Sequence, residues 1–374
     1  MSKKLILLGA TGSIGTSTVD VVRSHRDDFT IVAVSAFSSR EKCEAIAREF
    51  GAKAYVGEDA ALRAVEENEA DVCLVATVGM SGLKPTVAAI GKGMDIALAT
   101  KEVMVMAGEL VTALAKRKGV RFLPVDSEHS AIFQCLGGRD MARGADFSQA
   151  AGKPLPRWDV AKLILTASGG PFLDGPADLS QVTVAEALNH PRWKMGPKVT
   201  VDSATMMNKG FEILEARWLF DVPVGQIDVV VHPESIVHSL VTFKDGSTMA
   251  QLCPPDMRVP IQYALSWPDR LPAERAALDL AALGSLTFRK PDPVRFPCLR
   301  LVKEACAAGG CATAVLAAAD EWAVDAFIKG KIKYTEIAQT VEKTLSKAPK
   351  FEMDSLDAVF AAADWVRESL TSNV

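Results

Sequence analysis

Asp126 and Glu128 stand two residues apart, directly after the apolar run VRFLPV. If the strand that this run predicts extends to them, the alternation of side chains places both carboxylates on one face, with Ser127 and His129 on the other. Two carboxylates aimed at one spot could form part of a binding or catalytic site. A polar strand end in contact with water is the ordinary alternative for such a pair, so the rest of the sequence must decide.

Lys101 and Glu102 follow the preceding apolar run, MDIALAT, in a similar way. Open α/β sheets bind their ligands at the carboxyl ends of the strands. An ordinary pair of charges in the first turn of a helix is the alternative. Because charges follow two successive predicted strands, we favour a site at this edge of the sheet.

More polar residues with a possible role in binding lie downstream. In a helix predicted over 203–220, three of them fall in one sector because they are three or four residues apart, namely Asn208, Lys209 and Glu212. For such a helix alone, surface salt bridges are the commoner explanation. Near them are small donors, next to glycines, of the kind that hold phosphate oxygens: Ser168, His190 and Ser203.

The segment LILLGATGSIG sets Gly9, Gly12 and Gly15 between a predicted strand and a predicted helix. A helix amino terminus offers N–H groups and a positive dipole end to a pyrophosphate, and glycines let the backbone approach it. The spacing is GxxGxxG, not the GxGxxG of the commonest fingerprint. As the first strand–turn–helix unit of an alternating sheet, it favours a dinucleotide over a plain tight turn.

The end of the second predicted strand indicates which dinucleotide binds. A sheet that holds the ribose of NAD carries Asp or Glu there. This strand ends instead in SAFSSREK, where Ser38, Ser39 and Arg40 suit the 2′-phosphate of NADP. A solvated helix start with serine as its N-cap is the alternative for this turn.

The elements that must position these residues predict an α/β fold. From 4 to about 136, short apolar runs alternate with amphipathic segments, which indicates a Rossmann-like, doubly wound parallel sheet. The stretch 139–159 is typical of a surface connection. Beyond it, the runs QIDVVVH, SIVHSLVTFK and STMAQLC predict antiparallel pairing in a central α+β domain. Recurring prolines from 268 to 297 predict a stiff linker, and helical spacing predicts a C-terminal bundle.

Length and composition favour small-molecule chemistry. The 374 residues exceed the size at which a single core keeps growing, so several domains are expected. A net charge of −4 and a pI near 5.8 argue against nucleic acid as the main partner. The seven cysteines lack CxxC or CxxH spacing and predict reduced thiols. Without a signal peptide or an apolar stretch of membrane-spanning length, we expect a cytoplasmic protein with no membrane contact.

In order along the chain, GATGSIG, TKE, VDSEHSAIFQ, SGGPF, NHPRWKMG and VDSATMMNKGFEILEARWLF closely resemble the 1-deoxy-D-xylulose 5-phosphate reductoisomerase family of isoprenoid precursor biosynthesis. Further motifs extend the resemblance to about residue 290, and the rest agrees in length and helical character. It implies an NADPH- and metal-dependent conversion of 1-deoxy-D-xylulose 5-phosphate to 2-C-methyl-D-erythritol 4-phosphate. The implied stages are a metal-assisted rearrangement by retro-aldol and aldol steps, and reduction by hydride from NADPH.

The resemblance also implies an assembly and a division of the chain. The protein should be a homodimer with an NADPH-binding domain at 1–125 and a catalytic and dimerisation domain at 126–267. A linker at 268–292 and a C-terminal helical domain at 293–374 would follow. We assign the C-terminal helices packing alone, since they carry no chemical motif.

By the same matching, Asp126, Glu128 and Glu212 correspond to the ligands of one divalent cation, Mg²⁺ or Mn²⁺. Hard cations take oxygen ligands, and three crowded carboxylates without a cation would each cost several kcal/mol. His129 need not be a ligand, because alternation along the strand points it away from the acids.

The resemblance assigns the remaining residues to substrate or cofactor. Lys101, also proposed as catalytic with the three acids, should contact the substrate near its reacting oxygens together with Ser127 and Glu128. The substrate's backbone and phosphate would be held by Ser168, His190, Ser203, Asn208, Lys209 and Glu212. The cofactor would contact Thr11, Gly12, Ser13, Ile14, Glu102 and Gly196. The family usually has Asn where this chain has Thr100, which leaves the contact of Thr100 to the cofactor open.

Two other functions remain as alternatives. An NADP-dependent semialdehyde dehydrogenase would need an activated cysteine with a nearby base. Cys135, His232 and His238 sit in apolar runs, however, and are better interpreted as core residues. A non-catalytic NADPH sensor with a degenerate second domain would be expected to have lost the carboxylates, yet all three are present.

The segment NHPRWKMGPK (189–198) is predicted to be a lid over the bound substrate. Its prolines, glycine and charges make a continuous helix or strand unfavourable. It nevertheless carries the large side chains of Trp193 and Met195, which a merely solvated loop would not need. Closure would place them over the ligands and exclude water. The alternative is that Trp193 is anchored in the core.

Overall fold

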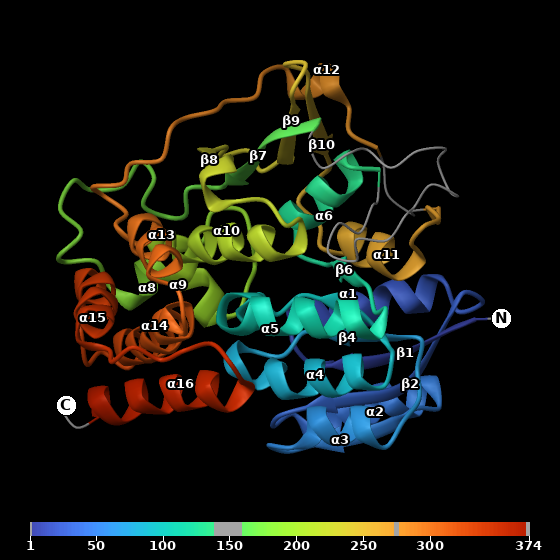
Figure 1. The fold of residues 1–374 in the computed structure, drawn as a ribbon. Coiled ribbons are helices and arrows are strands. Elements are labelled where there is room, and N and C mark those ends of the chain that lie inside the picture. The colour runs from blue at the N-terminus through green and yellow to red at the C-terminus, as the bar shows by residue number, and fades with distance from the viewer. Residues whose placement is uncertain (1, 138–158, 273–276, 372–374) are drawn as a thin grey trace.

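The computed structural model describes residues 2–137, 159–272 and 277–371. Apart from Asp159, the surface connection predicted at 139–159 lies outside the described residues. Within them, the chain forms a parallel sheet, a smaller mixed sheet and a group of C-terminal helices (Figure 1). The predicted α/β fold class is confirmed.

A six-stranded sheet forms the N-terminal part, and all of its strands are parallel. The strands are β1 (Lys3–Leu8), β2 (Phe29–Ala36), β3 (Lys53–Val56), β4 (Val72–Val75), β5 (Asp95–Leu98) and β6 (Phe122–Pro124). Their spatial order is β3-β2-β1-β4-β5-β6, so the direction of winding reverses between β1 and β4. Such a switch point leaves a crevice outside the carboxyl ends of the strands.

The helices that connect these strands bury the sheet on both faces. They are α1 (Ser13–Ser24), α2 (Arg40–Phe50), α3 (Ala60–Glu66), the 3-10 helix η1 (Gly79–Gly82), α4 (Leu83–Gly91) and α5 (Glu102–Lys118). Consecutive residues of β1, Leu5 to Leu8, are all buried. This explains why the strands read as continuous apolar runs, since a strand covered on both sides has no polar face.

The second sheet contains β7 (Val160–Ala167), β8 (Ile227–Val231), β9 (Val237–Phe243) and β10 (Thr248–Leu252), in the order β10-β9-β7-β8. The predicted antiparallel pairing holds for β9 and β10. It is wrong for β8, which pairs with β7 in parallel and is separated from β9 by β7. The helical segment between β7 and β8 supplies the long crossover that parallel neighbours require.

The helices around the second sheet differ from the prediction at one important point. They are α6 (Ser127–Cys135), α8 (Val184–Ala187), α9 (Pro197–Thr205), α10 (Met207–Leu219), η4 (Val224–Gln226) and α11 (Arg258–Ser266). The single helix predicted over 203–220 is wrong, because Met206 adopts a left-handed conformation with φ 63° and separates α9 from α10. No glycine or proline marks this break, so the sequence pattern could not reveal it.

The C-terminal helices lie together on one side of the molecule, next to α5 and α9 (Figure 1). They are α13 (Cys298–Ala308), α14 (Ala312–Ile328), α15 (Tyr334–Lys347) and α16 (Leu356–Thr371). The segment that leads to them contains the short helix α12 (Leu280–Leu283) and a bridge from Arg289 to Val231 of β8. A hydrophobic core runs through all these parts.

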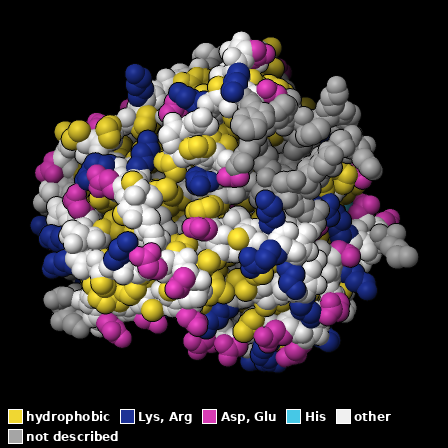
Figure 2. Space-filling model, viewed as in Figure 1, with side chains coloured by type: hydrophobic (Ala, Val, Ile, Leu, Met, Phe, Trp, Pro, Cys, Tyr) yellow, Lys and Arg dark blue, Asp and Glu magenta, His cyan; other side chains and the backbone are white. Residues whose placement is uncertain are grey.

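The face shown in Figure 2 has lysine, arginine, aspartate and glutamate side chains interspersed, without a broad basic area. Among the described residues, no helix has the length and apolar character needed to cross a lipid bilayer.

Candidate active site

A cavity of about 310 Å³ lies outside the carboxyl ends of β1, β5 and β6, where the N-terminal sheet meets α9 and α10. Most residues that the sequence singles out line it: Gly12, Ser13, Ile14, Thr100, Lys101, Glu102, Asp126, Ser127, Glu128, Ser168, His190, Gly196, Ser203, Asn208, Lys209 and Glu212. Thr11, Ser38, Ser39 and Arg40 do not line it. One cavity thus joins the glycine-rich turn to the acidic residues.

Asp126 and Glu128 converge for a reason other than the predicted one. The strand β6 ends at Pro124, and Asp126 is the N-cap of α6, where its carboxylate accepts a hydrogen bond from the Glu128 backbone N–H. Aspartate suits this position because it satisfies a free N–H of the first helical turn. The prediction that strand alternation aims the two acids is therefore wrong, although both acids do face the cavity.

Glu212 reaches the same spot from α10. Single oxygens of Asp126, Glu128 and Glu212 all lie within 4.8 Å of one another, an arrangement that could hold a metal ion. Two buried lysines neutralise part of this charge. Lys101 Nζ lies 2.6 Å from Asp126 and 3.0 Å from Glu212, and Lys209 Nζ pairs with Glu212 and lies 3.0 Å from Glu128.

The environment changes the acidity of these groups. Burial and the nearby Glu212 raise the pKa of Glu128 to about 7. Burial alone would raise the pKa of Asp126, but Lys101 and His129 hold it well below its usual value. Burial opposes a charge on Lys101, yet Asp126 and Glu212 raise its pKa well above the ordinary value. The lysines are therefore cations, and additional positive charge would favour ionised Glu128.

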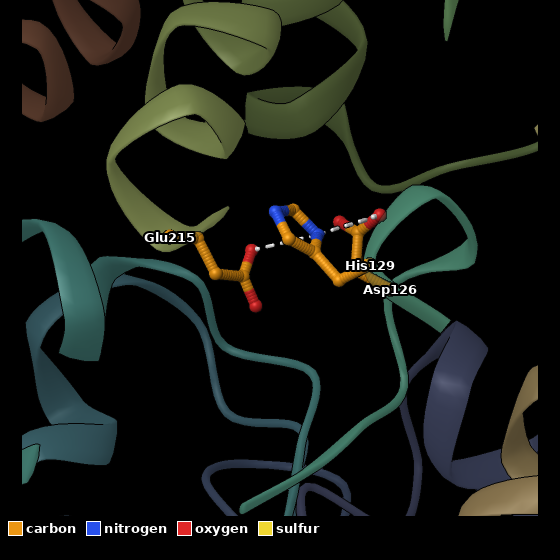
Figure 3. Close-up of side chains that lie close together, drawn as sticks. All are labelled: Asp126, His129 and Glu215. Atoms are coloured by element: carbon orange, nitrogen blue, oxygen red, sulfur yellow. Dashed lines mark ion pairs between the residues drawn. The ribbon is translucent and has the colours of Figure 1, made fainter. Parts of the chain in front are cut away.

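Behind this cluster lies a second layer formed by the fully buried side chains of His129 and Glu215, which Figure 3 shows together with Asp126. His129 Nδ1 lies 3.6 Å from Asp126 Oδ1 and 3.4 Å from Glu215 Oε2. Its Nε2 lies 2.9 Å from the backbone carbonyl of Glu212. The prediction that His129 points away from the acids is therefore wrong: the third residue of a helix lies beside the N-cap, whereas alternation on a strand would have separated them.

The protonation of this layer follows from its geometry. Burial alone would lower the pKa of His129, but Glu215 and Asp126 raise it to about 9. Burial raises the pKa of Glu215 to about 8, which by itself would favour a neutral acid. These two shifts oppose each other. We favour the ion pair, because Nε2 faces a carbonyl, which can only accept a hydrogen bond, while Nδ1 faces carboxylate oxygens. The ring therefore fits its doubly protonated form.

The other end of the cavity contains a histidine with a defined neutral form. The Nδ1 atom of His190 accepts hydrogen bonds from the backbone N–H groups of Arg192 and Trp193. Its Nε2 must then carry the proton and donate it to the Ser168 hydroxyl, 3.0 Å away. Burial lowers the pKa of His190 to about 4. The hydroxyl hydrogen of Ser168 is left free to donate to a ligand in the cavity.

The glycine-rich turn has the close packing that a dinucleotide site needs. Gly9 has φ 79°, and a Cβ on it would lie 2.3 Å from the Ala76 carbonyl oxygen. A Cβ on Gly15 would lie 2.2 Å from the carbonyl oxygen of Gly9. Larger residues at either position would push the turn apart, so the sequence pattern corresponds to a real steric requirement. The amino terminus of α1 follows directly and opens toward the cavity.

The turn after β2 is exposed, and Ser39 is the residue before α2, although its side chain makes no capping hydrogen bond. The Arg40 side chain is 66% exposed and pairs with Glu44, 3.3 Å away. Its exposure leaves the guanidinium accessible to a phosphate, which would compete with Glu44 for it. Thr100, in contrast, is buried and donates its hydroxyl to the carbonyl of Thr77.

The three other candidates are core residues, as predicted. Burial raises the pKa of the Cys135 thiol to about 11, so it is not an activated nucleophile. His232 and His238 are also buried. His232 Nε2 accepts from the backbone N–H groups of Ile236 and Val237, and His238 Nε2 lies 3.1 Å from the carbonyl of Cys253. These contacts argue against the dehydrogenase alternative.

Sequence reasoning missed several residues around the cavity. His129 and Glu215 were not assigned, although each is three residues from an assigned acid, a helical spacing that could have indicated them. Trp193 and Met195 line the cavity, which fits the predicted segment 189–198, but α9 already begins at Pro197. Trp193 is half-buried, which favours the lid over a core anchor. Met257, just before α11, also lines the cavity and had no sequence signal.

Comparisons with known proteins agree with this geometry. A family model described as 1-deoxy-D-xylulose 5-phosphate reductoisomerase matches residues 5–56 and 48–108, and two models of C-terminal domains of the same enzyme match 122–220 and 252–369. A reductoisomerase of this name from Geobacter metallireducens is 46% identical, covering 98% of this chain and 97% of its own length. The chain belongs to the 1-deoxy-D-xylulose 5-phosphate reductoisomerase family.

Further relatives cover the same extent. The reductoisomerase from Caldanaerobacter subterraneus is 47% identical over 98% of both chains. A solved reductoisomerase in complex with NADPH, fosmidomycin and magnesium has a TM-score of 0.91 and 39% identity, covering 99% of this chain and 98% of that one. The reductoisomerase from Zymomonas mobilis, in complex with NADPH, has a TM-score of 0.86 and 38% identity over 98% and 97% of the two chains. As a reductoisomerase, this protein is an oxidoreductase.

Proposed function

We propose that the protein converts 1-deoxy-D-xylulose 5-phosphate to 2-C-methyl-D-erythritol 4-phosphate, with NADPH and Mg²⁺ or Mn²⁺, in the synthesis of isoprenoid precursors. The observation that carries the proposal is the convergence of Asp126, Glu128 and Glu212 in the cavity that also contains the glycine-rich turn. Membership of the family supports the same reaction.

The chemistry of the donor set fits a hard divalent cation. Asp126, Glu128 and Glu212 offer oxygen ligands alone, which Mg²⁺ and Mn²⁺ prefer. A cation would also stabilise the ionised form of Glu128, which burial and Glu212 otherwise disfavour. When bound, the ion would supply Lewis-acid polarisation of the substrate's ketone and a neighbouring hydroxyl.

Other residues would bind and orient the substrate. Lys101 is already a cation beside Asp126, and Ser127 precedes the proposed metal ligand Glu128. These three residues, Lys101, Ser127 and Glu128, would contact the reacting oxygens. At the other end, the free hydroxyl hydrogen of Ser168 would donate to the phosphate, while His190 fixes that hydroxyl from behind. Ser203, Asn208 and Lys209 would complete the substrate site.

The cofactor site would extend from the glycine-rich turn to α9. Thr11, Gly12, Ser13 and Ile14 would hold the pyrophosphate at the amino terminus of α1. Ser38, Ser39 and Arg40 would bind the 2′-phosphate, and Glu102 and Gly196 would lie near the nicotinamide, which supplies the hydride. Thr100 would act through its backbone, because its hydroxyl is used by Thr77.

The decisive experiment is to follow NADPH oxidation when 1-deoxy-D-xylulose 5-phosphate is added to the purified protein, with and without a chelator. The proposal predicts oxidation that stops on chelation and resumes when Mg²⁺ or Mn²⁺ is restored. Identification of the methylerythritol phosphate by mass spectrometry would complete the test. Oxidation that chelation does not affect, or none at all, would refute it.

We also propose that the protein is a cytoplasmic homodimer. The exposed residues Met249 and Leu252 lie on β10, an edge strand of the mixed sheet that a second copy could cover. The seven cysteines are free thiols, which is typical of a reducing compartment. Light scattering of the purified protein would give the oligomeric state, and Met249→Lys should shift it toward monomer.

The proposed division into domains follows the same scheme: NADPH binding at 1–125, catalysis and dimerisation at 126–267, a linker at 268–292 and a C-terminal helical domain at 293–374. The end of β6 at Pro124 supports the first boundary. Limited proteolysis of the intact protein, with cleavage expected within 268–292, would test the linker.

A further inference from the structure

The helix α9 is the element that connects the two ends of the cavity. Gly196, its N-cap, and Ser203, in its last turn, both line the cavity, as does Asp202. Under the proposed function, Gly196 lies near the nicotinamide and Ser203 near the substrate phosphate. A small shift of this helix would therefore displace both binding regions. Lys198, on the same helix, does not line the cavity.

The C-terminal helices hold the first turn of α9 through Lys198. Its ammonium lies 3.0 Å from Asp320 of α14 and 2.5 Å from Asp202. It also lies 3.4 Å from Glu102, the first residue of α5. Asp320 is fully buried. This ion cluster links helices from the N-terminal, central and C-terminal parts of the chain.

The last turn of α9 is held by a different C-terminal helix. The Tyr334 hydroxyl, at the start of α15, donates a hydrogen bond of 2.6 Å to the carbonyl of Ala204. Ala204 is the neighbour of Ser203. The Tyr334 ring is fixed by edge contacts with Phe172 and Phe327. Both ends of α9 therefore depend on side chains that are more than a hundred residues away in sequence.

Packing alone does not explain an acid at position 320. Apart from Thr313, Glu321 and Asp325, the rest of α14 is apolar, with the sequence ATAVLAAADEWAVDAFI. Asp320 forms an ion pair with Lys198, which it shares with Asp202 and Glu102. A buried ion pair is rarely more stabilising than apolar side chains of similar size, whereas its geometry is more specific.

We propose that Asp320 and Tyr334 are positioning residues for the reaction, acting on α9 from its two ends. Asp320 acts through Lys198 and Glu102 on the nicotinamide side, and Tyr334 acts through Ala204 on Ser203 and the substrate phosphate. This assigns the C-terminal helices a role beyond packing. The inference rests on the proposed function, because it uses the binding regions assigned there.

Two variants test the inference, because each should affect a different ligand. Asp320→Asn keeps the shape but not the charge, and should raise the Kd for NADPH by about tenfold while the KM for 1-deoxy-D-xylulose 5-phosphate changes by less than about threefold. Tyr334→Phe removes one hydroxyl and should raise that KM by about fivefold, with the Kd for NADPH unchanged. The Kd is measured by fluorescence titration of NADPH without substrate.

Val359→Ala is the matched control. Val359 is fully buried in α16, which packs on α14 and α5. Its truncation should therefore lower the melting temperature without changing the Kd for NADPH or the KM for the substrate. The inference would be overturned if the binding of NADPH and of substrate weakened together, in proportion to the loss of melting temperature, in all three variants. It would also be overturned if neither the Kd for NADPH nor the KM for the substrate changed. If Asp320→Asn does not fold, the KM and the Kd of Tyr334→Phe still test the inference. Turnover by the unaltered protein tests the proposed function separately.

Discussion

Two carboxylates on α10, Glu212 and Glu215, are three residues apart and equally buried, yet they have different surroundings. Glu212 faces the cavity, where it accepts hydrogen bonds from Lys101 and Asn208. Glu215 lies behind it and faces the imidazole of His129 (Figure 3). The difference shows that burial does not identify a functional acid. What distinguishes them is whether the carboxylate can reach a ligand or only another side chain.

The largest effect is expected from Glu212→Gln. The amide keeps the shape but removes a proposed metal ligand, so turnover should fall by about a thousandfold or more, since Lewis-acid stabilisation contributes several kcal/mol to the transition state. The concentration of Mg²⁺ needed for half-maximal activity should rise at the same time. Steady-state kinetics over a range of Mg²⁺ concentrations measure both. An unchanged metal requirement would show that α10 contributes no ligand to the metal site.

Trp193→Ala tests whether a third region, the segment 189–198, closes over the cavity in front of Glu212. Its half-buried ring can be removed with little loss of stability, while kcat/KM should fall by about a hundredfold, as lost positioning can cause. Kinetics and thermal unfolding of the same variant provide the measurement. If the ring were a core anchor instead, the variant would lose roughly 3–5 kcal/mol of stability.

Glu215→Gln is the direct counterpart of Glu212→Gln on the same helix. Removing this charge loosens His129, which contacts both Asp126 and the backbone of Glu212, so affinity for the cation should fall by about tenfold. At saturating Mg²⁺, kcat should stay within a few-fold of the parent. A loss of kcat as large as in Glu212→Gln, not restored by added metal, would show that the two layers do not differ in role.

The smallest effect is expected far from both acids, at Arg40. Arg40→Ala removes a charged donor to the 2′-phosphate of NADP, so the preference for NADPH over NADH should narrow by about tenfold. The ratio of kcat/KM for the two cofactors measures it, with Arg48→Ala on the same helix as the control. Equal use of both cofactors by the parent would show that the turn after β2 was misinterpreted.

The sequence predicted the N-terminal sheet well because its signals are local. Each strand is a short apolar run and each connection an amphipathic segment, so the alternation could be followed residue by residue. The strand order of the second sheet could not be predicted, since β7 inserts between β8 and β9 through tertiary packing. The break at Met206 was missed for a similar reason: a left-handed methionine has no sequence signal.

The candidate site shows the same limit. Asp126 and Glu128 could be paired from their spacing, although a strand was predicted where the structure has the start of α6. A helix N-cap also brings residues at this spacing together. Glu212 was joined to them by resemblance alone. His129 could have been indicated only by its helical spacing from Asp126, because its other partner, Glu215, is distant in sequence. Asp320 could not be assigned, since its partner Lys198 is distant in sequence and meets it only after folding.

The most direct test of the central claim is the binding of Mn²⁺ without substrate, measured by electron paramagnetic resonance on the parent, Glu212→Gln and Glu215→Gln. We predict that the parent binds a single Mn²⁺ per chain. Glu212→Gln should lose at least about a hundredfold in affinity, and Glu215→Gln about tenfold. Equal affinity in the parent and in Glu212→Gln would contradict the assignment of the cavity carboxylates as the metal site.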